Sequence, residues 1–264
     1  MNLYDDEIAY NDYCFGALVD HTRKLGVYND TLFIIIGDHG EAFYEHGVYS
    51  HGHTPFEEVI HVPMVMKFPQ NQYQGTRVKS LVTLVDIFPT VTGVGGVTIE
   101  EKTLSFLQGQ NLIPLLTGEL TQARAHVFSD TQILDVHNRY LSVRGDRWKY
   151  IRVQRPGKDK KQTLLRAVRH VLGKGLLWDV IRSPRHFLRN YFRTPGGYLF
   201  DLMSDPFEQH NLVTTQLDVT EEMQRLLNTW ELENEKLASE NRMTLQDYEE
   251  SDVLQKHLEK LGYL

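Results

Sequence analysis

An aspartate and a histidine directly follow a buried apolar run near the start of the chain. Residues 32–36 are Leu-Phe-Ile-Ile-Ile, the pattern of a strand covered on both faces, and Gly37 separates them from Asp38 and His39. In open α/β sheets, ligands bind outside the carboxyl ends of the strands. A carboxylate and an imidazole placed there are suitable ligands for a divalent metal ion. The sequence therefore predicts a metal site that would assist chemistry at an anionic ester.

A further candidate, His51, lies twelve residues after His39 in a glycine-containing segment. A histidine beside a transferring oxygen can donate a proton or a hydrogen bond. The neighbouring Gly52 lets a substrate approach the backbone closely. We therefore give His51 the catalytic role and rank His53 behind it. Ser50 is not proposed as a nucleophile, because no G-x-S-x-G elbow surrounds it.

Composition narrows the class of protein. The chain has 264 residues, 41% of them hydrophobic and 24% charged, as in a globular protein with a sizeable core. A net charge of −7 argues against nucleic acid as a partner. The single cysteine, Cys14, excludes an intrachain disulfide, and we expect it on the buried side of a helix. No apolar run has membrane-spanning length and the acidic start does not resemble a signal peptide, so the localisation stays unknown.

The first half of the chain, residues 1–125, has the element order of an α/β domain. We predict an amphipathic helix at 4–26, the buried strand at 31–36, a short strand at 63–69 and a strand running into a helix at 81–91. A helix that leads into a buried strand is typical of a mostly parallel sheet flanked by helices. The predicted fold class is therefore α/β.

Residues 126–264 are predicted to form a small antiparallel C-terminal subdomain. Its expected elements are short and carry turn signals, of which Gly145-Asp146 is the clearest. They are a strand at 127–129, a hairpin at 140–152, a strand at 198–202 and a C-terminal helix at about 219–238.

A basic insertion interrupts this subdomain at residues 152–193. It holds twelve Lys or Arg and two Asp, with apolar residues recurring at helical spacing between them. This composition predicts a basic helix that would bind an anionic polymer or a membrane surface. The alternative interpretation is an amphipathic helix packed on the domain with its charges in solvent.

Taken in order, these segments resemble the sulfatases, a family of the alkaline phosphatase-like superfamily. Each segment is weakly specific alone, and the resemblance depends on their shared order along the chain. The matching segments are the Asp-His-Gly segment at 38–52, the strand at 62–66, a D-hydrophobic-x-P-T helix start at 86–90, an R-x-x-x-[FWY]-K-Y hairpin at 144–150 and a strand with a D-P-x-E-x-x-N-L turn at 198–212.

The resemblance implies an alkaline phosphatase-like fold and a metal-dependent sulfuric ester hydrolase. It implies that Asp38 and His39 ligate one divalent metal ion, calcium first, with zinc or manganese as alternatives. It also implies that His51 contacts the ester oxygens or assists the leaving group. The implied substrate is a sulfated small molecule or polysaccharide.

Sulfatases also carry a C-x-[PA]-S-R segment, whose Cys or Ser becomes the nucleophile formylglycine. The chain contains no such segment, and Cys14 stands in a different context. Covalent catalysis needs an activated nucleophile. We therefore expect an N-terminally truncated sulfatase that is inactive by itself, with formylglycine expected upstream.

Two other functions stay open at this point. A phosphodiesterase or a phosphoethanolamine transferase would use a similar Asp-His pair, and the transferases share the twelve-residue step to His51. A non-catalytic remnant would only bind anions, through residues 152–193. The D-P-x-E turn at 205–208 and the last residues of the chain favour the sulfatase.

Overall fold

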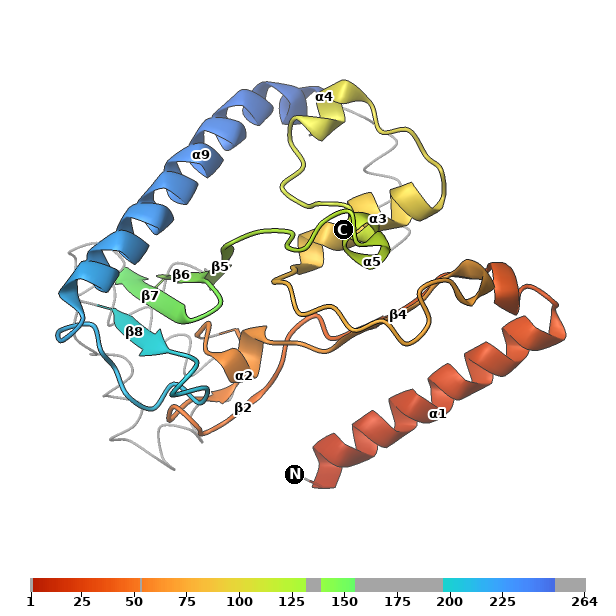
Figure 1. Cartoon of the computed structure of the whole chain (residues 1–264), viewed down its shortest axis with the longest axis horizontal. Helices are drawn as coiled ribbons and strands as arrows, with labels where there is room; N and C mark the ends of the chain where they lie inside the picture. The colour runs from red at the N-terminus through yellow and green to blue at the C-terminus, as the bar shows by residue number, and fades with distance from the viewer. Residues whose placement is uncertain (1, 53, 132–138, 155–196, 250–264) are drawn as a thin grey trace.

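The chain folds around a two-stranded ribbon, a small hairpin and a four-stranded sheet (Figure 1). The structure, a computed structural model, describes residues 2–52, 54–131, 139–154 and 197–249. His53 and nearly all of the predicted insertion at 152–193 lie outside the described residues. Among those residues, no helix has the length and apolar character needed to cross a membrane.

The N-terminal part is a long helix packed on a strand ribbon. Its elements are α1 (Asn2–Lys24), η1 (Tyr28–Asp30), β1 (Phe33–Ile36) and β4 (Met64–Lys67). Strand β4 pairs with β1 antiparallel, with Phe33 opposite Lys67. Phe15 of α1 meets Phe33 edge to face at 5.8 Å between ring centroids. Aromatic packing therefore fixes the helix on the ribbon at the start of β1.

The mostly parallel sheet predicted for residues 1–125 is wrong for the described residues, because all their strand pairs are antiparallel. A parallel return needs a crossover connection, usually a helix packed on the sheet. Between β1 and β4 the chain makes only a short hairpin and one helical turn, so it returns in the opposite direction. Burial of β1 on both faces was also wrong, since Ile35 is 46% exposed. Cys14 is exposed on α1.

Short helices follow β4: η2 (Pro69–Asn71), η3 (Leu84–Asp86), α3 (Ile87–Val94), α4 (Glu101–Leu104) and α5 (Ile113–Thr117). The strand predicted at the start of 81–91 is replaced by a helix cap. Thr83 donates its backbone N–H to the Asp86 carboxylate at 2.7 Å and accepts from the Val85 N–H at 3.2 Å. Asp86 is fully buried and also accepts from the Gln110 N–H at 2.8 Å. This capping box begins η3 and prevents an extended conformation.

The predicted antiparallel sheet is present, with strands β5 (Val127–Thr131), β6 (Arg139–Arg144), β7 (Trp148–Gln154) and β8 (Tyr198–Asp201) in that order. The Gly145 N–H donates to the Trp148 carbonyl at 2.9 Å and closes the predicted hairpin. The first half of helix α9 (Leu217–Glu249) packs on one face of this sheet, and the helix then continues past it (Figure 1). Its Met223 and Leu227 are buried against the sheet and form the main core. The division into two domains at residue 125 stays a prediction.

The opposite face of the sheet packs on the segment that precedes a single helical turn, α2 (Glu57–Ile60). Phe56, which is 1% exposed, contacts Ile151 and Phe200 there. Successive side chains of a strand alternate between faces. Lys149 is two residues before Ile151 and so lies on this same face, where it is fully buried. A cation therefore sits where α2 meets the sheet.

Candidate functional site

The segment that carries Asp38 and His39 leaves β1 and runs against α2. The Gly40 N–H donates to the Val59 carbonyl at 2.7 Å, and the Gly37 N–H donates to the Pro63 carbonyl at 3.2 Å. A Cβ atom at Gly40 would lie 2.1 Å from the Glu58 carbonyl oxygen. Only glycine allows this approach, so α2 determines where the segment turns.

His39 is held in one tautomer by the backbone carbonyl of the next residue, Gly40. Its Nδ1 lies 2.9 Å from the Gly40 carbonyl oxygen. A carbonyl can only accept, so we assign the proton to Nδ1, which leaves the Nε2 lone pair for a ligand. That Nε2 lies 3.8 Å from Oδ1 of the exposed Asp38. Two atoms that each lie about 2.1 Å from one zinc ion are at most about 4.2 Å apart, so this pair can share an ion.

Glu41 and His51 are brought together by a hairpin. Strands β2 (Ala42–Phe43) and β3 (Tyr49–Ser50) pair antiparallel with Ala42 opposite Ser50. The residues just outside this pair are Glu41 and His51, and Glu41 Oε2 lies 2.8 Å from His51 Nδ1. A carboxylate accepts here, so His51 presents Nε2 on the other side of its ring. Sequence reasoning missed Glu41; the hairpin's register is the signal that would have identified it.

The predicted site residues lie together. The His39 and His51 rings stack with centroids 3.8 Å apart. Ligand atoms of His39, Glu41 and His51 all lie within 4.8 Å of one another, and Asp38 adjoins this group through His39. Two imidazoles and a carboxylate form a donor set that suits a transition-type divalent ion. The residues present therefore fit a bound metal.

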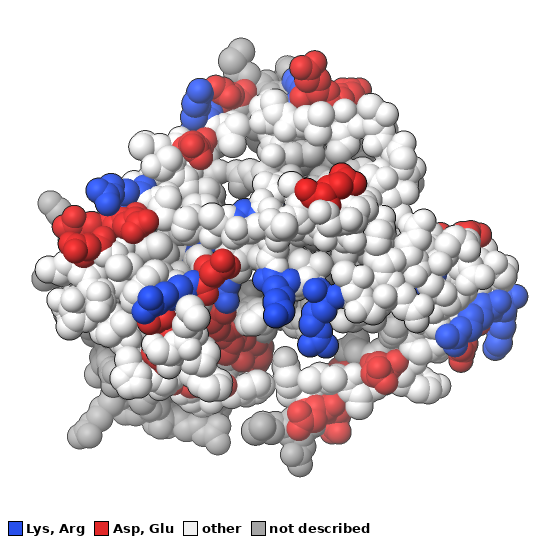
Figure 2. Space-filling model, viewed as in Figure 1, with Lys and Arg blue, Asp and Glu red and all other residues white. Residues whose placement is uncertain are grey.

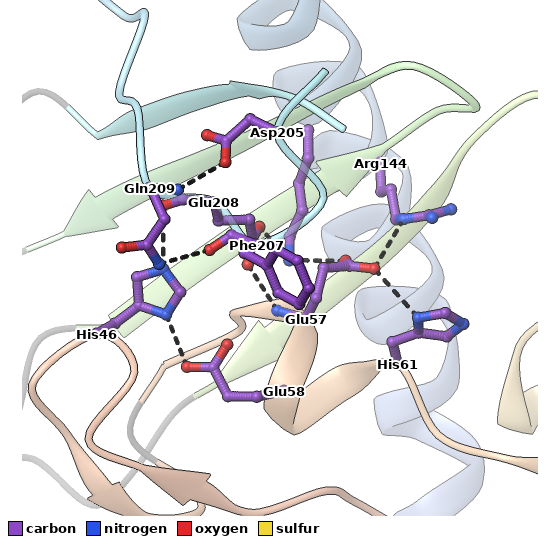
Figure 3. A network of polar contacts seen from close by, with 10 residues as sticks. His46, Glu57, Glu58, His61, Arg144, Asp205, Phe207, Glu208 and Gln209 are labelled. Carbon is purple, nitrogen blue, oxygen red and sulfur yellow. Dashed lines mark hydrogen bonds and ion pairs between the residues drawn. The ribbon is translucent and has the colours of Figure 1, made fainter. Parts of the chain in front are cut away.

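A second polar cluster surrounds α2 (Figure 3). His46 lies 2.8 Å through Nδ1 from Glu58 Oε1 and 3.0 Å through Nε2 from the Glu208 carbonyl oxygen. Its ring stacks on Phe56 with centroids 3.8 Å apart. Atoms of His46, Glu58 and Glu208 could also surround an ion. Both nitrogens of His46 already have protein partners, so we read this cluster as an internal network.

Lys149 completes this network from the sheet. Its Nζ lies 2.9 Å from Glu57 Oε1 and 2.7 Å from Glu208 Oε1. Arg144 Nε lies 3.3 Å from Glu57 Oε2, and the Glu57 N–H donates to Glu208 Oε2 at 2.7 Å. Two carboxylates therefore face two cations at the start of α2.

Burial and the neighbouring cations shift the pKa values of Glu208 and Glu57 in opposite directions. Burial raises the pKa of the Glu208 carboxyl, and Lys149 only partly opposes it. Burial also acts to raise the pKa of Glu57, but the charges of Lys149 and Arg144 outweigh it and lower the pKa overall. Glu57 is therefore the more firmly ionised partner of Lys149.

Known proteins that resemble this chain are sulfatases. The family model described as Sulfatase matches residues 1–97. The chain is 29% identical over 150 residues to Arylsulfatase K of Bos taurus, across 54% of this chain and 27% of that protein. It is 24% identical over 235 residues to Endo-4-O-sulfatase of Bacteroides thetaiotaomicron, across 87% of this chain and 41% of that protein. The chain thus spans well under half the length of these relatives.

A solved structure supports the fold. The chain superimposes with a TM-score of 0.59 on a protein whose structure was solved in complex with its substrate, D-glucosamine-2-N,6-O-disulfate. The match covers 86% of this chain and 38% of the other, at 19% sequence identity. At this identity the likeness shows a shared fold alone.

Gly40 should tolerate no side chain. We expect Gly40→Ala to lower the free energy of unfolding by about 1–3 kcal/mol, because the new methyl group would overlap the Glu58 carbonyl. Gly16→Ala in α1 is the matched control: its Cβ meets nothing within 4 Å, and alanine favours a helix by about 1 kcal/mol. Urea denaturation measures both. Equal effects of the two substitutions would contradict the close packing.

His46 should make stability depend on pH. Burial acts to lower the pKa of His46, but Glu58 and Glu208 outweigh it and raise the pKa above its ordinary 6.5. Its stabilisation is then fully present below pH 6.5 and is lost as the pH rises through the raised pKa. We expect wild type to exceed His46→Gln by about 1.5 kcal/mol at the acidic end, as for a hydrogen bond to a charged group. A difference in unfolding free energy that does not change with pH would contradict this.

Proposed function

We propose that the protein hydrolyses a sulfate ester at Asp38, His39 and His51, because residues 1–97 match the family model described as Sulfatase. The observation that carries the proposal is the convergence of two imidazoles and a carboxylate beside Asp38 at the end of β1. The family resemblance supports the reaction class, and the Asp38 carboxylate beside Nε2 of His39 supports metal assistance.

Asp38 and His39 would hold one divalent metal ion. When bound, the metal would neutralise the negative charge of the ester and polarise its oxygens. Calcium is the ion that the resemblance implies, whereas the Nε2 lone pair of His39 is a donor that zinc or manganese prefers. The three ions should therefore be compared directly.

His51 would act as the catalytic acid. Its Nδ1 is engaged by Glu41 at 2.8 Å, which leaves Nε2 on the opposite side of the ring for a substrate. A proton held at Nε2 can be given to the leaving oxygen. The Glu41 carboxylate keeps the ring in this orientation. Asp38, exposed at the end of β1, leaves the site accessible.

The nucleophile must come from elsewhere. Residues 1–264 contain no C-x-[PA]-S-R segment, so we propose that these residues do not turn over substrate by themselves. We also propose that parallel strands of the sulfatase sheet pair with β1 along the edge opposite β4. Among the described residues, the edge of β1 opposite β4 has no paired strand, so it is available for such pairing.

We propose a sulfated carbohydrate as the substrate class. One structural relative was solved with a sulfated glucosamine, and one sequence relative is an endo-4-O-sulfatase. A contact with an anionic polymer or a membrane surface at 152–193 stays a prediction. On the face shown in Figure 2, described Lys and Arg are interspersed with Asp and Glu.

Metal uptake tests the ligand assignment. We expect Asp38→Ala and His39→Ala each to weaken binding of calcium, zinc or manganese at least about 100-fold, beyond the usual effect of an outer-shell change. Isothermal titration calorimetry measures this on the whole chain. Asp20→Ala is the control, because Asp20 is an exposed acid on α1 that pairs with Arg23. Wild-type affinity in both Asp38→Ala and His39→Ala would refute the metal site.

The role of His51 is tested by turnover in protein that includes the nucleophile segment. We expect His51→Ala to lower kcat on para-nitrophenyl sulfate by about 10²–10⁴-fold, the usual contribution of a general acid. His21→Ala in the last turn of α1 is the control. Faster hydrolysis of para-nitrophenyl phosphate than of the sulfate would favour the phosphoryl-transfer alternative.

A further inference from the structure

Two of the segments that carry the family resemblance do not reach the candidate active site. The hairpin at 144–150 supplies Arg144 and Lys149, and the turn at 205–208 supplies Glu208. All three side chains meet at Glu57 instead, the first residue of α2 (Figure 3). We call Glu57, Arg144, Lys149 and Glu208 the α2 clamp.

The same helical turn contacts the site segments. Val59 of α2 accepts the Gly40 N–H at 2.7 Å, one residue after His39. Glu58 of α2 binds His46, which lies in the turn of the hairpin that joins Glu41 to His51. Both segments that carry the proposed site residues are therefore fastened to α2.

Helix α2 cannot hold its own position. It has four residues, which is one turn, and an isolated turn is unstable because helix nucleation is unfavourable. Its position must come from tertiary contacts. The strongest of these is Lys149, which is 0% exposed and lies between Glu57 at 2.9 Å and Glu208 at 2.7 Å. The Glu208 carboxylate also accepts the first N–H of the helix.

We infer that Lys149 and Glu208 are positioning residues for the site: they fix α2, and through it the segments that bear His39 and His51. The inference rests on the proposed function for the catalytic relevance of His39 and His51. The effect of Lys149 and Glu208 on the position of α2 does not depend on that function. Metal ligands must be held within about 0.5 Å of the productive geometry. A displaced α2 would move Gly40 and the hairpin together.

The first test measures the link without any metal. Amide hydrogen exchange of Gly40 is compared with that of Tyr150, which lies in the paired sheet. Lys149→Met should speed Gly40 exchange relative to Tyr150 by about tenfold or more, because local opening becomes easier. Arg147→Met is the matched control: Arg147 precedes Lys149 by two residues and pairs with Asp201 at 2.8 Å. An unchanged Gly40 ratio in Lys149→Met would overturn the inference.

The second test separates positioning from simple stabilisation. Lys149→Met leaves two buried carboxylates without their shared cation, whereas adding Glu208→Gln removes one of those charges and should restore folding. We expect both variants to bind zinc or manganese about tenfold more weakly than wild type, as when an outer-shell partner is lost. Wild-type affinity in the doubly substituted protein would overturn the inference. Absence of binding in wild type and in Arg147→Met would instead refute the metal site. The Gly40 exchange ratio would then still show whether Lys149 holds α2 and Gly40 in position.

Discussion

A fully buried ammonium group is the constraint on which the rest of the structure depends. Lys149 lies on the sheet face that meets α2, with no exposure to solvent. Removing a charge from water costs several kcal/mol unless opposite charges lie close by. The chain supplies them from two distant segments, Glu57 from α2 and Glu208 from the turn after β8. The sheet, the helix and the turn must therefore assemble together.

This requirement explains how a small sheet supports a site that lies elsewhere. The antiparallel sheet contributes no candidate ligand, yet it holds one side of α2 in place. The segment that carries His39 is hydrogen-bonded to the same helix through Gly40, and the β2–β3 hairpin is hydrogen-bonded to it through His46. The ion pairs of Lys149 at the start of α2 thereby fix the position of the segments that carry His39 and His51. Glu208 itself has a left-handed backbone conformation, with φ of 55°.

Local signals predicted the local parts of this structure well. Gly145-Asp146 closes a hairpin as expected, and the periodicity of α9 places Met223 and Leu227 in the core. The direction of strand pairing could not be read this way, because the apolar run at β1 is the same for parallel and antiparallel neighbours. The strand expected at the start of 81–91 is a helical turn instead, because the hydrogen bonds of the Thr83–Asp86 capping box stabilise η3. The apolar pattern of this segment does not reveal those hydrogen bonds.

The sequence indicated which residue types would do chemistry, but not their partners. Asp38 and His39 were chosen for their position after an apolar run and His51 for its glycine-containing segment, and the structure brings the two histidine rings together. Sequence position could not identify Glu41 as a partner of His51, or Lys149 as a partner of Glu57. One depends on the register of a two-residue hairpin, and the other on a contact between residues 92 positions apart. Such contacts exist only after the chain has folded.

The ribbon of β1 and β4 has a consequence for how this chain behaves in solution. Ile35 and Val65 face each other across it and are 46% and 60% exposed. In the described part of the chain, each strand of the ribbon also has one edge without a paired strand. Open edges beside apolar side chains are templates for pairing with another copy. We therefore expect copies of the chain to associate through this ribbon, against the repulsion that the net charge of −7 provides.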